Sequence, residues 1–96
     1  MAVSIKRLII DSLKPRETSI LDLSKALATI EGVDEVDIVV TEVDVKTETI
    51  KLTIRGSNID YDAVCKKMSE LGATIRSVDE INVSKVKPTA IKVPIS

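Results

Sequence analysis

The spacing of hydrophobic residues constrains the fold of this chain more than any other feature. Apolar residues alternate, as is typical of strands, over 4–13, 36–45, 50–55 and 74–83. They recur at helical spacing between the first and second of these segments and between the third and fourth. Each strand-helix-strand half makes a right-handed crossover and the halves interleave, so the simplest closure is one antiparallel sheet. We therefore predict an α+β, ferredoxin-like βαββαβ sandwich, with a four-stranded antiparallel sheet and two helices on one face.

Capping residues mark the ends of both predicted helices. Ser19 and Asp60 are suitable N-caps, because their side-chain oxygens accept hydrogen bonds from free amides of the first turn. Gly32 and Gly72 mark the C-terminal ends, since glycine adopts a left-handed conformation without strain. Pro15 ends the first strand. The stripes expected to face the core are Ile20, Leu23, Leu27 and Ile30 in the first helix and Val64, Met68 and Leu71 in the second.

The second predicted strand changes phase, because its first apolar residues have even numbers and its last two have odd numbers. Side chains alternate strictly along a regular strand, so a β-bulge near Thr41 and Glu42 would place both sets on one face. The alternative is a strand covered on both faces, for instance by a neighbouring subunit. A four-residue hairpin loop, 46–49, is expected next. The residues concerned are Val36, Ile38 and Val40, followed by Val43 and Val45.

A chain of 96 residues is expected to form one domain with one core. We assign residues 1–84 to this domain and residues 85–96 to a Lys-rich C-terminal arm. The arm has three Lys and no acid, whereas residues 31–48 have seven acids and one Lys. This asymmetry could favour association of the acidic segment of one copy with the basic arm of another. The alternative is that the two regions are solvated separately.

The arm also carries an apolar alternation. Ile91, Val93 and Ile95 predict an assembly segment that adds to the edge strand of a neighbouring copy. A disordered tail is the alternative, because the segment is terminal. The sequence therefore predicts a homo-oligomer.

The sequence also indicates a compartment. No apolar run approaches the ~20 residues that span a bilayer, and the N-terminus leads into a strand pattern instead of a signal sequence. The single Cys65 cannot form an internal disulfide, which agrees with a reducing compartment. We expect a cytoplasmic protein with no membrane partner.

Four short segments carry a resemblance to a known family. They are Leu13–Pro15 (LKP), Val40–Ile54 (VTEVDVKTETIKLTI), Asn58–Asp60 (NID) and Ser77–Glu80 (SVDE). The chain resembles the archaeal domain-of-unknown-function family 211 over nearly everything that precedes the arm. The resemblance implies an archaeal source, the ferredoxin-like fold and a higher homo-oligomer. It brings no established reaction or catalytic residue, so no functional position is carried over.

Nucleic-acid binding is disfavoured by the expected open face of the sheet. RNA recognition motifs with this strand order stack bases on aromatic side chains of the central strands. Here Arg7, Lys51 and Arg55 could contact phosphates, but no aromatic ring is available to stack. Asp11 and Glu42 share the predicted face and would oppose a polyanion. We expect no nucleic-acid partner.

Catalytic residue types are scarce. The chain has no His, and Cys65 is its one thiol, so a transition-metal site or a Cys/His pair cannot form within one copy. Phosphate-binding glycine motifs are absent as well. Cys65 lies between Tyr61 and Met68 on a predicted helix and is expected to be a small core or half-buried residue. We therefore expect no enzymatic activity.

Carboxylates leave a hard cation as the cofactor class to consider, because Ca²⁺ is bound by oxygen ligands. Glu42 and Asp44 would emerge from one face of the second strand about 7 Å apart, and Asp11 would share that face. These are the candidate metal residues. Lys51 is expected opposite Asp44, so a cross-strand ion pair is the alternative. A divalent-ion site is expected where a subunit contact brings the carboxylates together.

Together these features predict a non-enzymatic, self-associating binding or regulatory module. The alternative is a sensor that binds an amino-acid-like small molecule between subunits, with Gly32, Val33 and Asp34 at a suitable place after the first helix. Ordinary turn residues explain that segment equally well.

Overall fold

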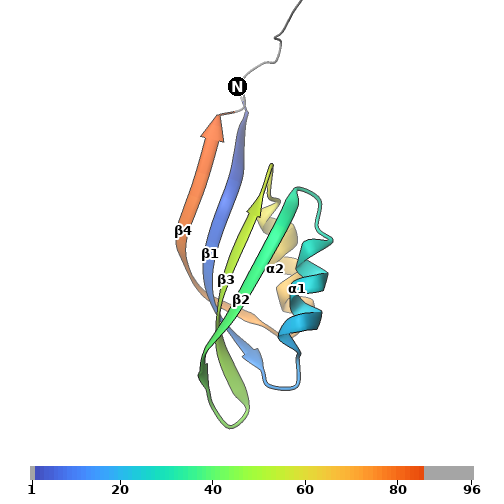
Figure 1. Ribbon diagram of the computed structural model, residues 1–96, viewed down its shortest axis with the longest axis vertical. Helices are drawn as coiled ribbons and strands as arrows, with labels where there is room; N and C mark the ends of the chain where they lie inside the picture. The colour runs from blue at the N-terminus through green and yellow to red at the C-terminus, as the bar shows by residue number, and fades with distance from the viewer. Residues whose placement is uncertain (1, 86–96) are drawn as a thin grey trace, which may run out of the picture.

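The alternation of apolar residues separates a helix-covered face of the sheet from an open face. The computed structural model describes residues 2–85 and contains one four-stranded sheet in the order β2-β3-β1-β4, with both helices on one side (Figure 1). Every neighbouring pair of strands is antiparallel. The predicted ferredoxin-like arrangement is confirmed. The elements are β1 (Val3–Pro15), α1 (Ile20–Ala28), β2 (Val33–Val43), β3 (Thr47–Gly56), α2 (Tyr61–Glu70) and β4 (Thr74–Lys85).

The core lies between the central strands and the helices. Leu8 and Ile10 of β1 and every second residue of β3 from Ile50 to Ile54 are fully buried. Leu23 and Leu27 of α1, with Val64 and Met68 of α2, bury the helical stripes predicted from the sequence. The layer is aliphatic apart from the half-buried ring of Tyr61. Burial is complete only over the two central strands, β1 and β3.

Both N-caps form as predicted, whereas α1 ends at Ala28 with Thr29 as its C-cap, before the predicted stop at Gly32. The Ser19 hydroxyl oxygen accepts hydrogen bonds from the amides of Leu21 at 3.0 Å and Asp22 at 3.3 Å. The Asp60 carboxylate accepts from the Ala63 amide at 3.1 Å. At the end of α2, Gly72 has a φ of 81°, which a residue with a side chain rarely adopts. These contacts set where each helix begins and where α2 ends.

The predicted bulge in β2 is present, since the pairing of β2 with β3 shifts register between Val40 and Glu42. Val43 then pairs with Glu48 on the helix-facing side. Val43 is nevertheless 58% exposed, because β2 runs past the helices at this point. Val45 lies beyond the strand and is 80% exposed.

Several predicted boundaries are wrong by a few residues. The hairpin loop is residues 44–46, not 46–49, because the Asp44 amide already donates to the Thr47 carbonyl at 2.8 Å. β2 begins at Val33, and β4 continues through Lys85. The arm residues Ile91, Val93 and Ile95 lie outside the described residues.

Candidate functional site

Edge strand β4 exposes apolar side chains on the helix-facing side of the sheet. Ile81 pairs with Leu8, and Val78 pairs with Ile10, so their side chains point the same way as two core residues. Leu8 and Ile10 are fully buried, yet Val78, Ile81 and Val83, the partner of half-buried Ile5, are 40%, 53% and 49% exposed. Figure 1 shows the reason, since the upper part of β4 extends away from both helices. We call Val78, Ile81 and Val83 the β4 strip.

The opposite edge, β2, is flanked by a groove. Val36, Ile38 and Val40 lie on the helix-facing side, but they are only partly buried, unlike their fully buried partners on β3. Helix α1 covers this side incompletely and leaves a groove of about 300 Å³ against β2. The groove is lined by Ile20, Leu21, Ser24, Val36, Asp37 and Ile38. Within residues 2–85, no strand pairs with the outer side of β2.

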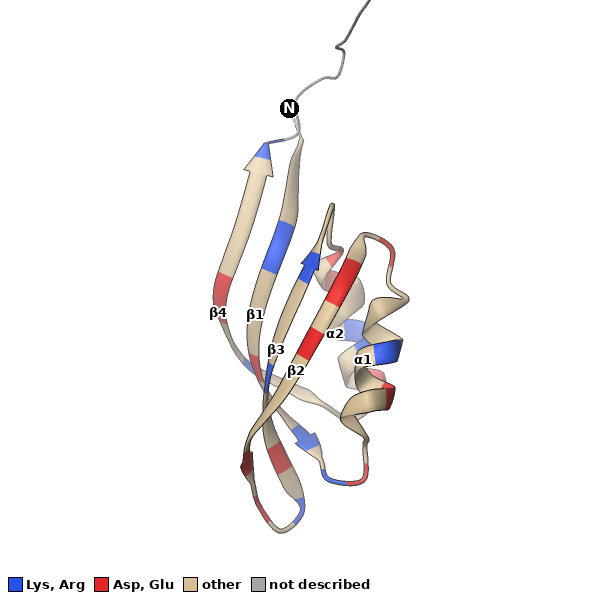
Figure 2. Cartoon of the chain, in the orientation of Figure 1, with Lys and Arg blue, Asp and Glu red and all other residues tan. Residues whose placement is uncertain are grey.

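Charged side chains on the open face are largely paired with one another. Arg55 of β3 lies 2.7 Å from Asp37 and 3.4 Å from Glu35, both on β2. The hydrogen bond with Asp37 is the main cause of the raised pKa of Arg55. Arg7 of β1 lies 3.7 Å from Glu80 of β4. Figure 2 shows the acidic residues of β2 beside the basic end of β3, and the basic segment of β1 between β3 and β4.

The structure places two of the three predicted metal residues on the open face, but on strands that β3 separates. Asp11 and Glu42 share the open face, since they pair with Lys51 and Thr49 of β3. Asp44 lies in the hairpin loop, where its carboxylate accepts the Val45 amide at 2.9 Å. The predicted opposition of Lys51 and Asp44 is wrong, because the bulge and the shorter loop place Lys51 between Asp11 and Val39.

One of these carboxylates is also paired with an arginine side chain. Arg76 of β4 lies 3.6 Å from Asp11. Among residues 2–85, no group of three or more His, Cys, Asp or Glu side chains has the arrangement needed to hold a metal ion. A site built on these carboxylates would therefore need ligands from a second copy.

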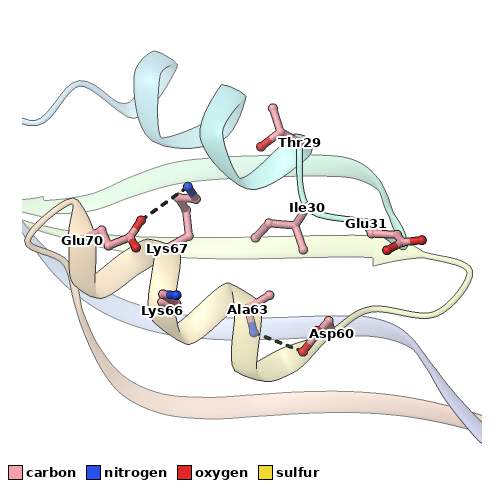
Figure 3. A pocket seen from close by; sticks show the side chains of 8 residues that line it. All are labelled: Thr29, Ile30, Glu31, Asp60, Ala63, Lys66, Lys67 and Glu70. Carbon is pink, nitrogen blue, oxygen red and sulfur yellow. Dashed lines mark hydrogen bonds and ion pairs between the residues drawn. The ribbon is translucent and has the colours of Figure 1, made fainter.

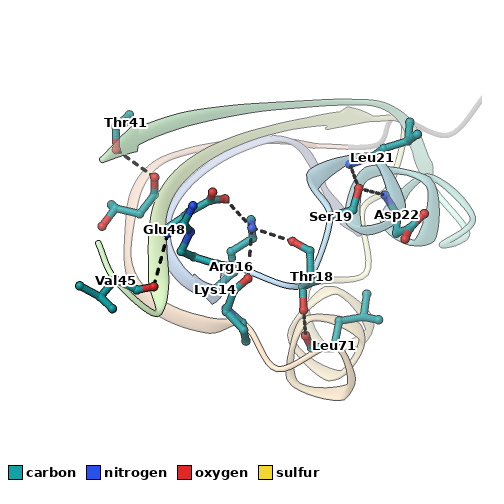
Figure 4. A network of polar contacts seen from close by, with 12 residues as sticks. Lys14, Arg16, Thr18, Ser19, Leu21, Asp22, Thr41, Val45, Glu48 and Leu71 are labelled. Atoms are coloured by element: carbon teal, nitrogen blue, oxygen red, sulfur yellow. Dashed lines mark hydrogen bonds and ion pairs between the residues drawn. The ribbon is translucent and has the colours of Figure 1, made fainter. Parts of the chain in front are cut away.

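The end of the sheet near the hairpin loop is held by a buried ion pair that the sequence analysis missed. The Lys14 ammonium lies 2.5 Å from the Glu48 carboxylate and donates to the carbonyls of Thr18 at 2.6 Å and Pro15 at 3.1 Å (Figure 4). The Arg16 amide donates to the Lys46 carbonyl at 3.0 Å. One feature of the sequence did indicate this burial. Lys14 has an even number, so it alternates in phase with the buried residues Leu8 and Ile10.

A polar groove lies between the end of α1 and one side of α2 (Figure 3). It has a volume of about 330 Å³ and includes Glu31, Asp60, Lys66 and Lys67 in its lining. Lys67 is already paired with Glu70 at 3.4 Å, and Asp60 caps α2. The groove therefore presents only one lysine, Lys66, outside these contacts.

The turn predicted for a small-molecule site serves the packing of the fold. Gly32 has a φ of 89°, and its carbonyl accepts the Ser57 amide at 3.0 Å. A Cβ atom on Gly32 would lie 2.0 Å from the Asn58 carbonyl oxygen. Val33 is buried in the core, whereas Asp34 is exposed. Close packing of two loops thus explains the glycine.

Cys65 is half-buried on α2, one turn after Tyr61. Hydrogen bonding with the Cys65 side chain is the main cause of the raised pKa of Tyr61, and burial adds to it. Neither helix among the described residues has the length and apolar character required to cross a membrane.

Comparison with known proteins finds similar sequences along most of the chain. The sequence profile of the DUF211 family, described as "Uncharacterized ArCR", matches residues 6–88. The chain is also 38% identical over 90 residues to "Uncharacterized protein MJ0319" of Methanocaldococcus jannaschii. That alignment covers 94% of this chain and 93% of the archaeal protein.

Proposed function

The chain belongs to the archaeal DUF211 family, and from its exposed surfaces we propose that it is a non-enzymatic binding or regulatory module that self-associates through the edges of its sheet. The observation that carries the proposal is the β4 strip, which continues the core layer past the helices into solvent. Such a strip on an open sheet edge is a surface suited to pairing with another chain. We further propose that the protein acts in the cytoplasm.

The strip supplies both kinds of interaction that edge pairing uses. Backbone groups on the outer side of an edge strand are free to hydrogen-bond to a second strand. Fully burying a Val or Ile side chain contributes about 1.5–3 kcal/mol, so covering three half-exposed ones contributes roughly 2–4 kcal/mol per copy. A second copy of the chain is the partner that supplies a matching apolar edge without any other protein.

The ion pairs on the open face favour a binding module over a nucleic-acid binder. Arg7 and Arg55 are engaged by carboxylates of neighbouring strands, which lowers their availability to a polyanion. Where a divalent cation takes part, we propose that it binds at a contact between copies that adds ligands to Glu42 and Asp44.

The test is the molar mass of the protein measured by light scattering over a range of concentrations. We expect wild type to form an oligomer and Ile81→Lys/Val83→Lys to have a lower mass, because lysines on an edge strand oppose pairing. Ala28→Lys, an exposed site on α1, is the matched control and should keep the wild-type mass. A wild-type protein that is monomeric at every concentration would overturn the proposal.

A further inference from the structure

The edge strand β2 and helix α1 form a groove that can accommodate one more strand. Val36, Ile38 and Val40 of β2 alternate along the helix-facing side and are only partly buried. Leu21 of α1 stands beside them and is 58% exposed. An added strand would place every second side chain in this groove and continue the core layer by one strand.

From this geometry we propose that residues 86–96 of the C-terminal arm of a second copy dock on β2 as a fifth strand, with Ile91 and Val93 in the groove between α1 and β2. The inference rests on the proposed self-association and names the edge and the segment that form the contact. Ile91, Val93 and Ile95 have the same two-residue spacing as Val36, Ile38 and Val40. Both sets extend over about 13 Å in a strand, so the two apolar rows match in length.

Charge favours the same occupant. Glu35 and Asp37 lie on the open-face side of β2 and share a single guanidinium, that of Arg55, so one negative charge remains there. Glu42 adds another on the same side. The arm has Lys87 and Lys92 and no acid. In a strand, Lys92 points away from its neighbours Ile91 and Val93 and would therefore lie on the acidic side of β2.

A second copy fits this arrangement better than the arm of the same chain. β4 ends at the sheet edge opposite β2, with β1 and β3 between them. A strand added outside β2 would lie four strand spacings from β4, about 19 Å, whereas five extended residues, 86–90, reach about 17 Å. No residue would remain for the two turns that the path within one chain requires. The arm that follows β4 of one copy would instead pair with the β2 edge of the next copy. Such a contact between two different edges is a head-to-tail contact.

The experiment follows the backbone amides of β2 in full-length protein by NMR. The variant Ile91→Ser/Val93→Ser is labelled with ¹⁵N, unfolded, and refolded with an excess of unlabelled wild type to exchange subunits. We expect the outward-facing amides between Val36 and Val40 to shift and to exchange with solvent about tenfold more slowly than in the labelled variant alone. Refolding with unlabelled Thr89→Ser, which keeps the apolar alternation, should give the same result.

The outcomes separate this inference from the proposed function. Refolding with unlabelled Ile91→Ser/Val93→Ser should leave the β2 amides unprotected. Unchanged β2 amides in the wild-type mixture, with an oligomeric mass retained, would overturn the docking of the arm but leave self-association in place. The β2 amides could instead exchange slowly in wild type alone, while those of the labelled variant in the mixture stay unprotected. That result would show that the arm folds back on its own chain, and it would also overturn docking between copies. A monomeric wild type would defeat both proposals.

Discussion

The ammonium of Lys14 lies 2.5 Å from the carboxylate of Glu48, its direct partner across β1 and β3, and the Lys14 side chain is 1% exposed. Two backbone carbonyls, of Pro15 and Thr18, accept hydrogen bonds from its other N–H groups. A charge so fully enclosed is tolerated because each of its donors has a partner. This group ties the loop before α1 to the start of β3.

Removing Glu48 is expected to cost more stability than removing Lys14. Glu48→Ala leaves the Lys14 ammonium buried without its counter-ion, which costs about 3–5 kcal/mol for an enclosed pair and somewhat less here because the Glu48 side chain is 19% exposed. Lys14→Met leaves a carboxylate that reaches water and two carbonyls without a donor, at about 1–3 kcal/mol. Urea denaturation of both variants measures the difference, and equal losses would contradict the asymmetry.

Gly32 and Gly56 are expected to be intolerant of alanine. A Cβ on Gly56 would lie 1.8 Å from the Gly32 carbonyl oxygen, and a Cβ on Gly32 would lie 2.0 Å from that of Asn58. Both clashes are with backbone, so either substitution is expected to cost more than ~3 kcal/mol. Gly72→Ala is the control, because its Cβ would meet only Pro15 at 3.3 Å and the main cost is the positive φ, about 1–2 kcal/mol. Thermal unfolding of the three variants gives the order, and Gly72→Ala as the most damaging would contradict it.

The order of elements and the caps were predictable because local signals specify them. Ser19 and Asp60 satisfy amides within three residues of themselves, and a bulge at Thr41 and Glu42 follows from a change of phase within one strand. The exposure of Val43 was not predictable in the same way. It depends on where the helices end over the sheet, which is a property of the assembled layers.

Long-range contacts explain what the sequence left open at the candidate site. Lys14 has a buried position in the alternation, but its burial requires Glu48 from another strand and two loop carbonyls. The exposure of Val78 and Ile81 likewise depends on β4 diverging from α2. The alternation of a strand indicates which side of the sheet a residue lies on. It does not indicate whether a helix covers the sheet at that residue.

Calcium is expected to stabilise the assembled protein but not single copies. In one chain Asp11 is paired with Arg76, and Asp44 lies in the loop away from the ladder that holds Glu42. Where a second copy adds ligands, Ca²⁺ at ten times its Kd adds about 1.4 kcal/mol to the stability of the assembly. The melting temperature of wild type should therefore rise with Ca²⁺ and fall with chelator.

The controls for this titration are Glu42→Gln/Asp44→Asn, which removes two candidate ligands, and Ile81→Lys/Val83→Lys, which is expected to have a lower mass than wild type. Neither should respond to Ca²⁺. A wild-type melting temperature and mass that do not change between chelator and saturating Ca²⁺ would eliminate the carboxylate site.

Tyr61 offers a direct readout of the helix α2 environment, because it is the one aromatic residue of the chain. Its pKa is raised, first by hydrogen bonding with Cys65 and then by burial, so the neutral phenol is favoured in the folded state. The resulting stabilisation is fully present below the unfolded-state pKa of about 10 and is lost as pH rises through the folded-state pKa. Phenolate absorbance should therefore appear at higher pH in the native protein than in urea.

Cys65→Ala should bring the native and denatured titrations of Tyr61 closer together, whereas Ser69→Ala, an exposed site on the same helix, should leave their separation unchanged. Coincident native and denatured titrations in wild type would contradict the contact between Tyr61 and Cys65.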